Sequence, residues 1–262
     1  MTAHFSFFRP AVAAPPQSAN RQQRWRPKLR SILFLLLIIG SLALIFNVDR
    51  TLTAEDREYI QLYLPHVPEG VAPSLTYADQ IILIERAQRA VFERTTGWVG
   101  IPEGQPREPK ELYLSRSGMC YDRSRVLEKI FVYLGFPTRH LSLFTREANV
   151  AAWITLLFHH VPSHAISEVL TKKGWLMVDS NTLWVSLDAK FNPVSVPELQ
   201  RRGLFTKWYK PIINKDRQIY NTNFILVYGL YSRHGRFYPP FIPGIPDFRI
   251  RGLLYNFDQL WN

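Results

Sequence analysis

The residues of this sequence best suited to chemistry are its single cysteine, one histidine and one aspartate. Cys120 follows Ser117–Met119 and directly precedes a predicted helix over Arg123–Leu134. A cysteine at a helix N-terminus faces unpaired N–H groups and the positive end of the macrodipole, which favour the thiolate over the thiol. The position suits a nucleophile. From position alone, a small buried structural cysteine is an equal alternative.

His164 begins one predicted strand, 164–170, and Asp179 ends the next, 175–179. If the two strands form a hairpin that turns at 172–173, Asp179 is the diagonal neighbour of His164, about 7 to 8 Å away between backbones, so the side chains can meet. A histidine that accepts a thiol proton and is oriented by a carboxylate is the arrangement of cysteine acyl-transfer enzymes. For His164 alone, an ordinary surface or core imidazole is the commoner interpretation.

The elements that must position these residues indicate an α+β fold. Val126, Ile130 and Leu134 recur at intervals of four residues and predict a helix that ends at Gly135. Strands are predicted over 138–144, 164–170 and 175–179, the last two forming an antiparallel hairpin. Upstream, the sequence predicts helices over 53–63 and 77–92 and an irregular connection over 97–110.

Together these blocks resemble the transglutaminase-like superfamily, whose core is a circularly rearranged papain-type fold. Four blocks carry the resemblance: Gly118-Met119-Cys120, Leu134-Gly135-Phe136-Pro137-Thr138-Arg139, His164-Ala165 and Trp175-Leu176-Met177-Val178-Asp179. The resemblance covers roughly 77–187. It implies a core in which the helix bearing the cysteine packs on an antiparallel sheet. It also implies that Cys120 is the nucleophile, His164 the base and Asp179 the orienting acid.

The sequence departs from the family's pattern beside the base. Many members have an aromatic residue two positions after the histidine, where this chain has Ile166, whereas the glutamate of that strand is kept as Glu168. The backbone N–H of the cysteine is the natural first donor of an oxyanion hole. The candidates for the second donor are Trp98, Tyr113 and Ser117. The acidic cluster that calcium-dependent relatives need is not visible, so we do not carry that activity over.

An apolar run, Ser31–Val48, contains no charged residue. As a helix it would be roughly 27 Å long, close to the ~30 Å hydrocarbon core of a bilayer. The run predicts a single transmembrane helix, with a cleaved signal peptide as the alternative because Ser41-Leu42-Ala43 has small residues at the spacing of a cleavage site. The basic residues of 21–30 directly precede it, so the N-terminus is expected in the cytoplasm and residues 49–262 in the periplasm or its equivalent.

Composition excludes several other classes of protein. A chain of 262 residues that is 47% hydrophobic supports one sizeable core. The net charge is +11, but residues 1–30 hold six basic residues and no acidic one, so the remainder offers no nucleic-acid surface. One cysteine excludes a disulfide scaffold. His159 and His160 lie near His164, but no fourth ligand stands at a supporting spacing, so we expect neither a metal nor a cofactor.

We therefore predict five segments. They are a disordered basic cytoplasmic tail (1–30), the transmembrane helix (31–48), a membrane-proximal linker with a short helix (49–74), the catalytic core (75–190) and an aromatic- and proline-rich extension packed on the core (191–262). The functional hypothesis is an envelope thiol enzyme, anchored in the inner membrane, that forms a thioester from an amide. Its expected substrate is an envelope protein or peptide, with hydrolysis slightly ahead of cross-linking. The alternative is a non-catalytic binding or scaffold module in an envelope or polysaccharide-export assembly.

Overall fold

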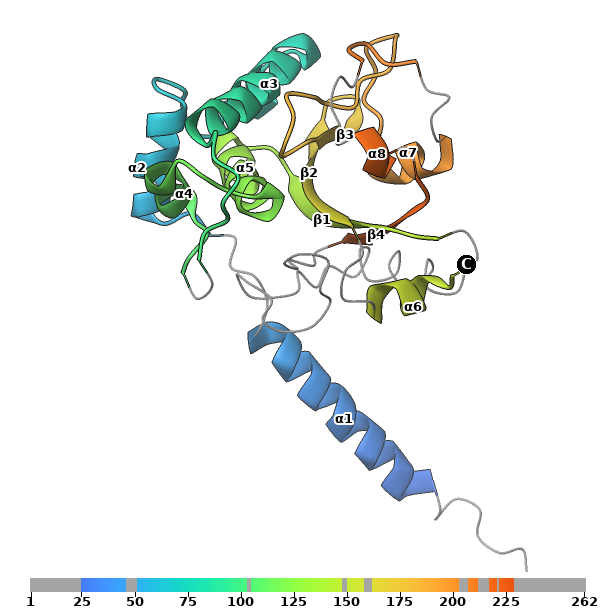
Figure 1. The fold of residues 1–262 in the computed structure, drawn as a ribbon. Coiled ribbons are helices and arrows are strands. Elements are labelled where there is room, and N and C mark those ends of the chain that lie inside the picture. Colours follow the sequence, from blue (N-terminus) through green and yellow to red (C-terminus); the bar gives the residue numbers. More distant parts are fainter. Residues whose placement is uncertain are drawn as a thin grey trace, which may run out of the picture. The chain divides into compact units, whose positions relative to one another are not determined.

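The computed structural model describes residues 25–45, 51–102, 105–147, 150–157, 162–202, 207–211, 217–220 and 222–228 (Figure 1). The chain divides into two compact units, Met1–Ile45 and Phe46–Asn262, which are described separately. The predicted disordered tail before residue 25 and the aromatic and proline-rich run at 237–248 lie outside the described residues.

In the first unit, helix α1 spans Trp25–Ile45. Its start corrects the predicted boundary at 30, because residues 25–30 are helical and not disordered. Arginine, lysine and leucine are good helix formers, so an apolar helix extends into its basic flank. The large apolar side chains between Leu29 and Ile39 are exposed, as in Phe34 at 64%. Within the described residues, no helix combines the length and the apolar character that crossing a membrane requires.

The second unit is α+β, as predicted, and contains a four-stranded antiparallel sheet in the order β3-β2-β1-β4. Its longer helices are α2 (Ala54–Tyr63), α3 (Tyr77–Arg94) and α5 (Cys120–Leu134), and its strands are β1 (Thr138–Thr145), β2 (Ser163–Thr171), β3 (Gly174–Val178) and β4 (Phe224–Tyr228). Short helices complete it: a 3-10 turn (Ala72–Ser74), α4 (Pro109–Ser115), α6 (Ala152–Leu157), α7 (Val196–Arg202) and α8 (Arg217–Tyr220).

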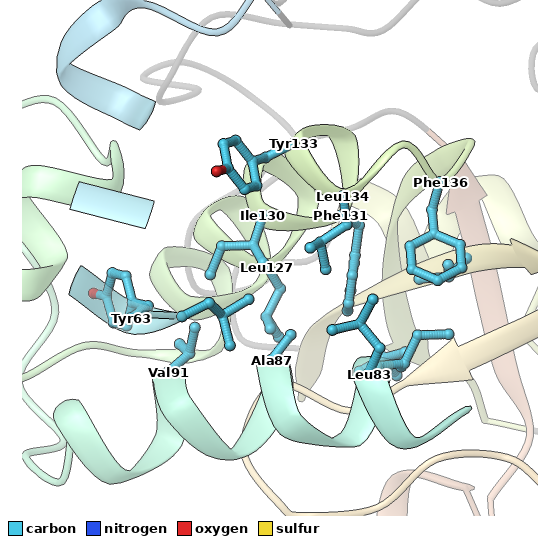
Figure 2. Close-up of a cluster of buried hydrophobic side chains, with 14 of the residues drawn as sticks. Tyr63, Leu83, Ala87, Val91, Leu127, Ile130, Phe131, Tyr133, Leu134 and Phe136 are labelled. Atoms are coloured by element: carbon cyan, nitrogen blue, oxygen red, sulfur yellow. The ribbon is translucent and has the colours of Figure 1, made fainter. Parts of the chain in front are cut away.

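The sheet separates two hydrophobic clusters. Helices α2 to α5 gather on one side of the sheet, and α7 and α8 lie on the other (Figure 1). The first cluster joins α2, α3 and α5 to Val169, Leu176 and Val178 of the sheet. Figure 2 shows Leu83, Ala87 and Val91 on one face of α3, directed toward Leu127, Ile130 and Phe131 of α5. The second cluster joins Leu141, Ile166 and Met177 to residues of the C-terminal part, Tyr220 among them.

Helix α5 begins at Cys120, three residues before the predicted start. Met119 is the N-cap residue, and its backbone N–H donates to the Asp122 carboxylate at 2.9 Å. This acidic cap in the first turn extends the helix beyond its apolar stripe, which is why the periodicity alone placed the start too late. The helix ends as predicted, at Gly135 in the left-handed conformation (φ 89°).

The hairpin of β2 and β3 has the predicted register. It turns through Lys172 and Lys173, and Thr171 pairs with Gly174, whose φ of 135° suits a residue without a Cβ. Extended beyond the last paired residues, this register sets His164 opposite Asn181. His164 is the second residue of β2, and Asp179 directly follows β3.

Two predicted boundaries need correction. We predict 49–74 as a linker with a short helix, but Ile60, Tyr63 and Leu64 are buried in the first cluster, so this segment belongs to the core. We predict 191–262 as an extension packed on the core, but Phe224–Tyr228 is a strand of the sheet itself. The composition of the surrounding sequence concealed this strand, whose five residues are buried.

Candidate active site

Cys120 is the first residue of α5 and is partly exposed. The segment that precedes it is held by residues 97–101, which run alongside. Gly97 and Ser117 form a bridge, and the Ser117 hydroxyl donates to the carbonyl of Val99 and accepts from its N–H, at 2.8 and 2.9 Å. Ile101 N–H donates to the Asp122 carboxylate at 3.2 Å. The cysteine therefore lies at a helix start that residues 97–101 hold on one side through one backbone bridge and the side chains of Ser117 and Asp122.

The structure brings the three predicted site residues together. The His164 Nε2 atom lies 3.1 Å from Asp179 Oδ2, and both side chains are buried. The Cys120 side chain is near enough to the His164 ring to raise its pKa. An ionised carboxylate only accepts hydrogen bonds, so Nε2 carries a proton and Nδ1 is the ring nitrogen left for proton exchange.

The pKa values of the histidine and the aspartate shift in opposite directions. Burial lowers the pKa of His164, but the Asp179 charge, the hydrogen bond to it and the Cys120 side chain outweigh burial and raise that pKa to about 10. Burial raises the pKa of Asp179, but His164, the Tyr220 hydroxyl and the Asn181 N–H outweigh it and hold the pKa below its ordinary value. The pair is therefore an imidazolium and a carboxylate at neutral pH.

Four donors saturate the Asp179 carboxylate. Its Oδ1 atom accepts the backbone N–H groups of Asn181 and Thr182 at 2.6 and 2.9 Å. Its Oδ2 atom accepts from His164 and from the Tyr220 hydroxyl. A carboxylate offers about four lone-pair directions, so its orientation is fixed from both ends. This geometry suits a group whose task is to hold an imidazole.

Gln88, on α3, fixes the loop that carries Asp179. Its side-chain amide donates to the carbonyls of Asp179, Thr182 and Trp184, at 2.8, 3.0 and 2.8 Å. The side chain is 3% exposed, so these bonds satisfy carbonyls that would otherwise be buried without donors. The loop after β3 is therefore tied directly to α3.

Arg123 joins the start of α5 to the two neighbouring segments. Its buried guanidinium donates to the Thr95 hydroxyl and carbonyl, to the Gly97 carbonyl and to Asn181 Oδ1, at 2.6 to 3.0 Å. Burial lowers its pKa, and the charges of Cys120, Asp122 and Asp179 act in the opposite direction. Arg123 therefore supplies a fixed positive charge close to the cysteine and the aspartate.

The three candidates for a second oxyanion donor have different surroundings. The Ser117 hydroxyl is engaged by the backbone of Val99. The Tyr113 ring packs edge-on against Tyr59 and Tyr63 in the first cluster. Trp98 is 52% exposed, and its ring lies 4.7 Å from the Arg123 guanidinium. Of the three, only Trp98 is placed beside a residue that also contacts the Asp179 loop.

Ile166 and Glu168, two and four residues after the histidine on β2, contact the core and the neighbouring elements. Ile166 is fully buried in the second cluster, so its side chain faces the core. Glu168 is also buried and pairs with Arg139 at 2.5 Å, while its other oxygen accepts from the Val196 N–H at 2.6 Å. His159 and His160 lie outside the described residues, and among those described no cluster of histidine, cysteine, aspartate and glutamate could hold a metal.

Sequence reasoning missed Tyr220, Gln88 and Arg123. Tyr220 is 41 residues from Asp179, in a region without periodicity, and no local pattern marks it. Gln88 stands on the buried face of α3, where a polar residue among Ile84, Ala87 and Val91 is a signal for a buried hydrogen bond. Arg123 is likewise a charged residue in the first turn of a helix, where the macrodipole favours acidic side chains.

Comparison with known proteins adds little. No protein-family model matches the sequence, and neither does any curated protein. Among solved structures, the chain is similar to a candidate cysteine protease from Cytophaga hutchinsonii, with 13% sequence identity and a TM-score of 0.26 over 53% of this chain and 46% of that chain. The chain therefore spans less than half the length of that protein. At this TM-score, the similarity supports no assignment of fold or function.

Proposed function

We propose that this chain is a cysteine enzyme that acts on amide bonds, with a transglutaminase-like core. Cys120 is its nucleophile, His164 its general base and Asp179 the acid that orients the histidine. One observation carries the proposal: the His164 imidazole is hydrogen-bonded to the Asp179 carboxylate and close enough to Cys120 to interact with its side chain, and the cysteine lies at the start of a helix. A partly exposed thiol beside a buried base also suits attack on a substrate that approaches from solvent.

The chemistry follows from this arrangement. The Cys120 thiolate attacks the carbonyl carbon of the amide, and the carbonyl electrons move to oxygen. The backbone N–H of Cys120 is the first donor to that oxyanion. When the C–N bond breaks, His164 gives its proton to the leaving amine, and a thioester remains on the sulfur. His164 then takes a proton from water, whose oxygen attacks the thioester, and the acid leaves with the thiolate restored.

Replacing water by an amine in the last step would give a cross-linked product. We place hydrolysis slightly ahead of cross-linking. A protein or peptide of the cell envelope is the proposed substrate.

Alkylation by iodoacetamide tests the cysteine–histidine pair directly, because Cys120 is the only cysteine of the chain. In the full-length protein, we expect the rate to reach its plateau well below pH ~8.5, the range of an ordinary cysteine. His164→Ala should move the plateau to higher pH. Cys120→Ser should take up no label and should also remove hydrolysis of a peptide library. A slow thiol that is indifferent to His164 would favour the binding-module alternative.

We also propose that α1 anchors the chain in the inner membrane, with the second unit outside the cytoplasm. Two features support the anchor: the exposed apolar side chains from Leu29 to Ile39, and a charge-free sequence, 31–48, that extends past the described end of α1 at Ile45. The full chain should resist carbonate extraction and dissolve in detergent.

The replacement of Leu35 and Leu36 by arginine should release the chain into the carbonate supernatant, since charged side chains are costly in the bilayer core. Ile82→Arg is the matched control, because Ile82 is also an exposed apolar residue, at 64%, but lies on α3. Extraction of the wild-type chain by carbonate would refute the anchor.

A further inference from the structure

Tyr220 reaches the candidate site from the C-terminal part of the chain. It is the last residue of α8 and is 3% exposed. Its ring lies edge-on to His164, with centroids 6.1 Å apart, and tilted against Trp184 at 5.6 Å. Its hydroxyl donates to Oδ2 of Asp179, the same oxygen that faces His164 Nε2. Two donors therefore converge on one carboxylate oxygen, and one of them is the base of the proposed reaction.

The physical effect of this hydroxyl is to favour the charged form of the aspartate. The carboxylate is wholly buried, which by itself favours the protonated acid. A hydrogen bond donated to the charged form acts against burial, and the Tyr220 hydroxyl is one of the donors that lower the pKa of Asp179. The packing of the ring against His164 also limits how far the imidazole can rotate.

We propose that Tyr220 is a positioning residue of the proposed cysteine enzyme. It keeps the Asp179 carboxylate ionised and directed at His164, and it acts on Cys120 only through these two residues. The inference rests on the proposed function and adds a fourth residue to it. It also means that the active site is completed by the C-terminal part of the chain.

Removal of the Tyr220 hydroxyl should shift the protonation of Asp179 in one direction only. Without this donor, the buried carboxylate becomes more basic and takes up a proton at a higher pH. A neutral Asp179 no longer stabilises the imidazolium of His164, and the imidazolium no longer stabilises the thiolate. The acid limb of the Cys120 reactivity profile should therefore move to higher pH.

The test is the pH dependence of iodoacetamide alkylation in the full-length chain carrying Tyr220→Phe. A hydrogen bond to a charged group is strong enough to move the acid limb up by about one pH unit and to lower the rate on that limb about tenfold. Tyr63→Phe is the matched control, since Tyr63 is another buried tyrosine, whose hydroxyl has no hydrogen-bond partner among the described residues. This control should keep the wild-type profile.

Two further variants separate positioning from a structural role. In an Asp179→Asn background, Tyr220→Phe should cause no further shift, because no ionised carboxylate is left to stabilise. Should Tyr220→Phe fail to fold, 3-fluorotyrosine at position 220 keeps the ring and the hydroxyl. Its more acidic phenol donates a stronger hydrogen bond and should move the acid limb in the opposite direction, to lower pH.

The two proposals fail in distinguishable ways. If Tyr220→Phe and fluorotyrosine both leave the profile unchanged while His164→Ala displaces it, the role of Tyr220 is refuted and the cysteine–histidine pair stands. If His164→Ala leaves the profile unchanged, the proposed function itself is refuted, whatever the tyrosine variants do.

Discussion

At the scale of single residues, the candidate site is built around the charge of Asp179. The carboxylate is buried, saturated by four donors and set between an imidazole and a phenol. Charges of this kind are costly to bury unless every lone pair is engaged. Here the lone pairs of the carboxylate are engaged by donors from β2, from the loop after β3 and from α8. A purely structural role for Asp179 would not require one of its donors to be a histidine in contact with the cysteine.

The substitutions His164→Ala and Asp179→Asn should differ in severity. We expect the loss of alkylation rate at pH 7 to be roughly ten- to a hundredfold smaller for Asp179→Asn, since an orienting residue contributes less than the base. Asparagine keeps the size of the side chain and one acceptor oxygen, so it is the milder test of the carboxylate charge. The rate constants for iodoacetamide, measured side by side, give the ranking.

A reversed ranking would mean that another residue orients the imidazole. Asn181 is the neighbour best placed for that role, but its side-chain oxygen accepts from Arg123 at 3.0 Å. Arg123→Lys would then be informative, since a lysine does not reproduce the forked geometry of the guanidinium.

The raised pKa of His164 also predicts how stability depends on pH. A group whose pKa rises on folding stabilises the folded state fully below its unfolded value, 6.5, and loses that contribution as the pH rises through about 10. The difference in unfolding free energy between wild type and His164→Ala should therefore shrink between pH 6.5 and 10. The packing lost with the ring is independent of pH and adds only a constant.

Urea titrations followed by tryptophan fluorescence at several pH values within that window measure the difference. A difference that is flat, or that grows with pH, would contradict the ion pair of His164 and Asp179. The lowered pKa of Asp179 affects stability at acid pH, because the stabilisation that its carboxylate contributes is lost as the pH falls below about 4.

At the scale of helices and strands, the sequence predicted the features that depend on residues close together in the chain, such as helix caps and turns. Thr53 and Asp56 form the capping box that starts α2, and Gly135 ends α5, because caps depend on residues three or four positions apart. The turn at Lys172 sets the register that brings Asp179 to His164. The strand β4 and Tyr220 depend instead on contacts with β1 and Asp179, far away in the sequence, and no local pattern carries that information.

Gly135, which ends α5, has little room for a side chain. Its φ is 89°, and a Cβ built on it would lie 3.1 Å from Gly70 Cα and 3.3 Å from Pro73 Cδ. Gly135→Ala therefore adds a close contact with backbone to the cost of a left-handed conformation, about 1 kcal/mol or more. Gly70→Ala is the matched control, since Gly70 also has a positive φ, 72°, but nothing within 4 Å of its added Cβ.

Urea unfolding should rank the two glycine variants. Both should be less stable than wild type, and Gly135→Ala should lose more. Equal losses would mean that the 70–73 turn yields to the added methyl group, so that only the backbone conformation matters.

At the scale of the whole molecule, the helix that bears the cysteine is enclosed by charges that neutralise one another. Its polar face would ordinarily face water. Here Asp122 pairs with Arg107 at 2.8 Å, Arg125 with Glu108 at 3.1 Å, and Lys129 with Asp56 at 2.7 Å. The partners come from α2 and from the segment that ends at the start of α4. Because these positive and negative charges balance, this face contributes little to the excess positive charge of the chain.

The contact of Lys129 with α2 ties the N-terminal part of the second unit to α5, the helix that bears Cys120. Besides Asp56, the Lys129 ammonium donates to the Thr51 carbonyl at 2.9 Å and lies 3.1 Å from Glu108. Both members of the Lys129–Asp56 pair are about 5% exposed or less. Removal of one partner from a buried pair leaves the other charge without compensation.

Asp56→Asn should therefore lower the unfolding free energy by on the order of 3 kcal/mol, less whatever Glu108 restores. Glu93→Gln, which breaks the exposed pair with Arg89, is the control and should change stability by less than about 1 kcal/mol. Because the first hydrophobic cluster joins α2 to α5, the loss should appear in a single urea transition of the second unit, followed by tryptophan fluorescence. If α2 instead unfolded in a separate, earlier transition, the segment after residue 51 would be a docked arm and not part of the domain that carries the candidate site.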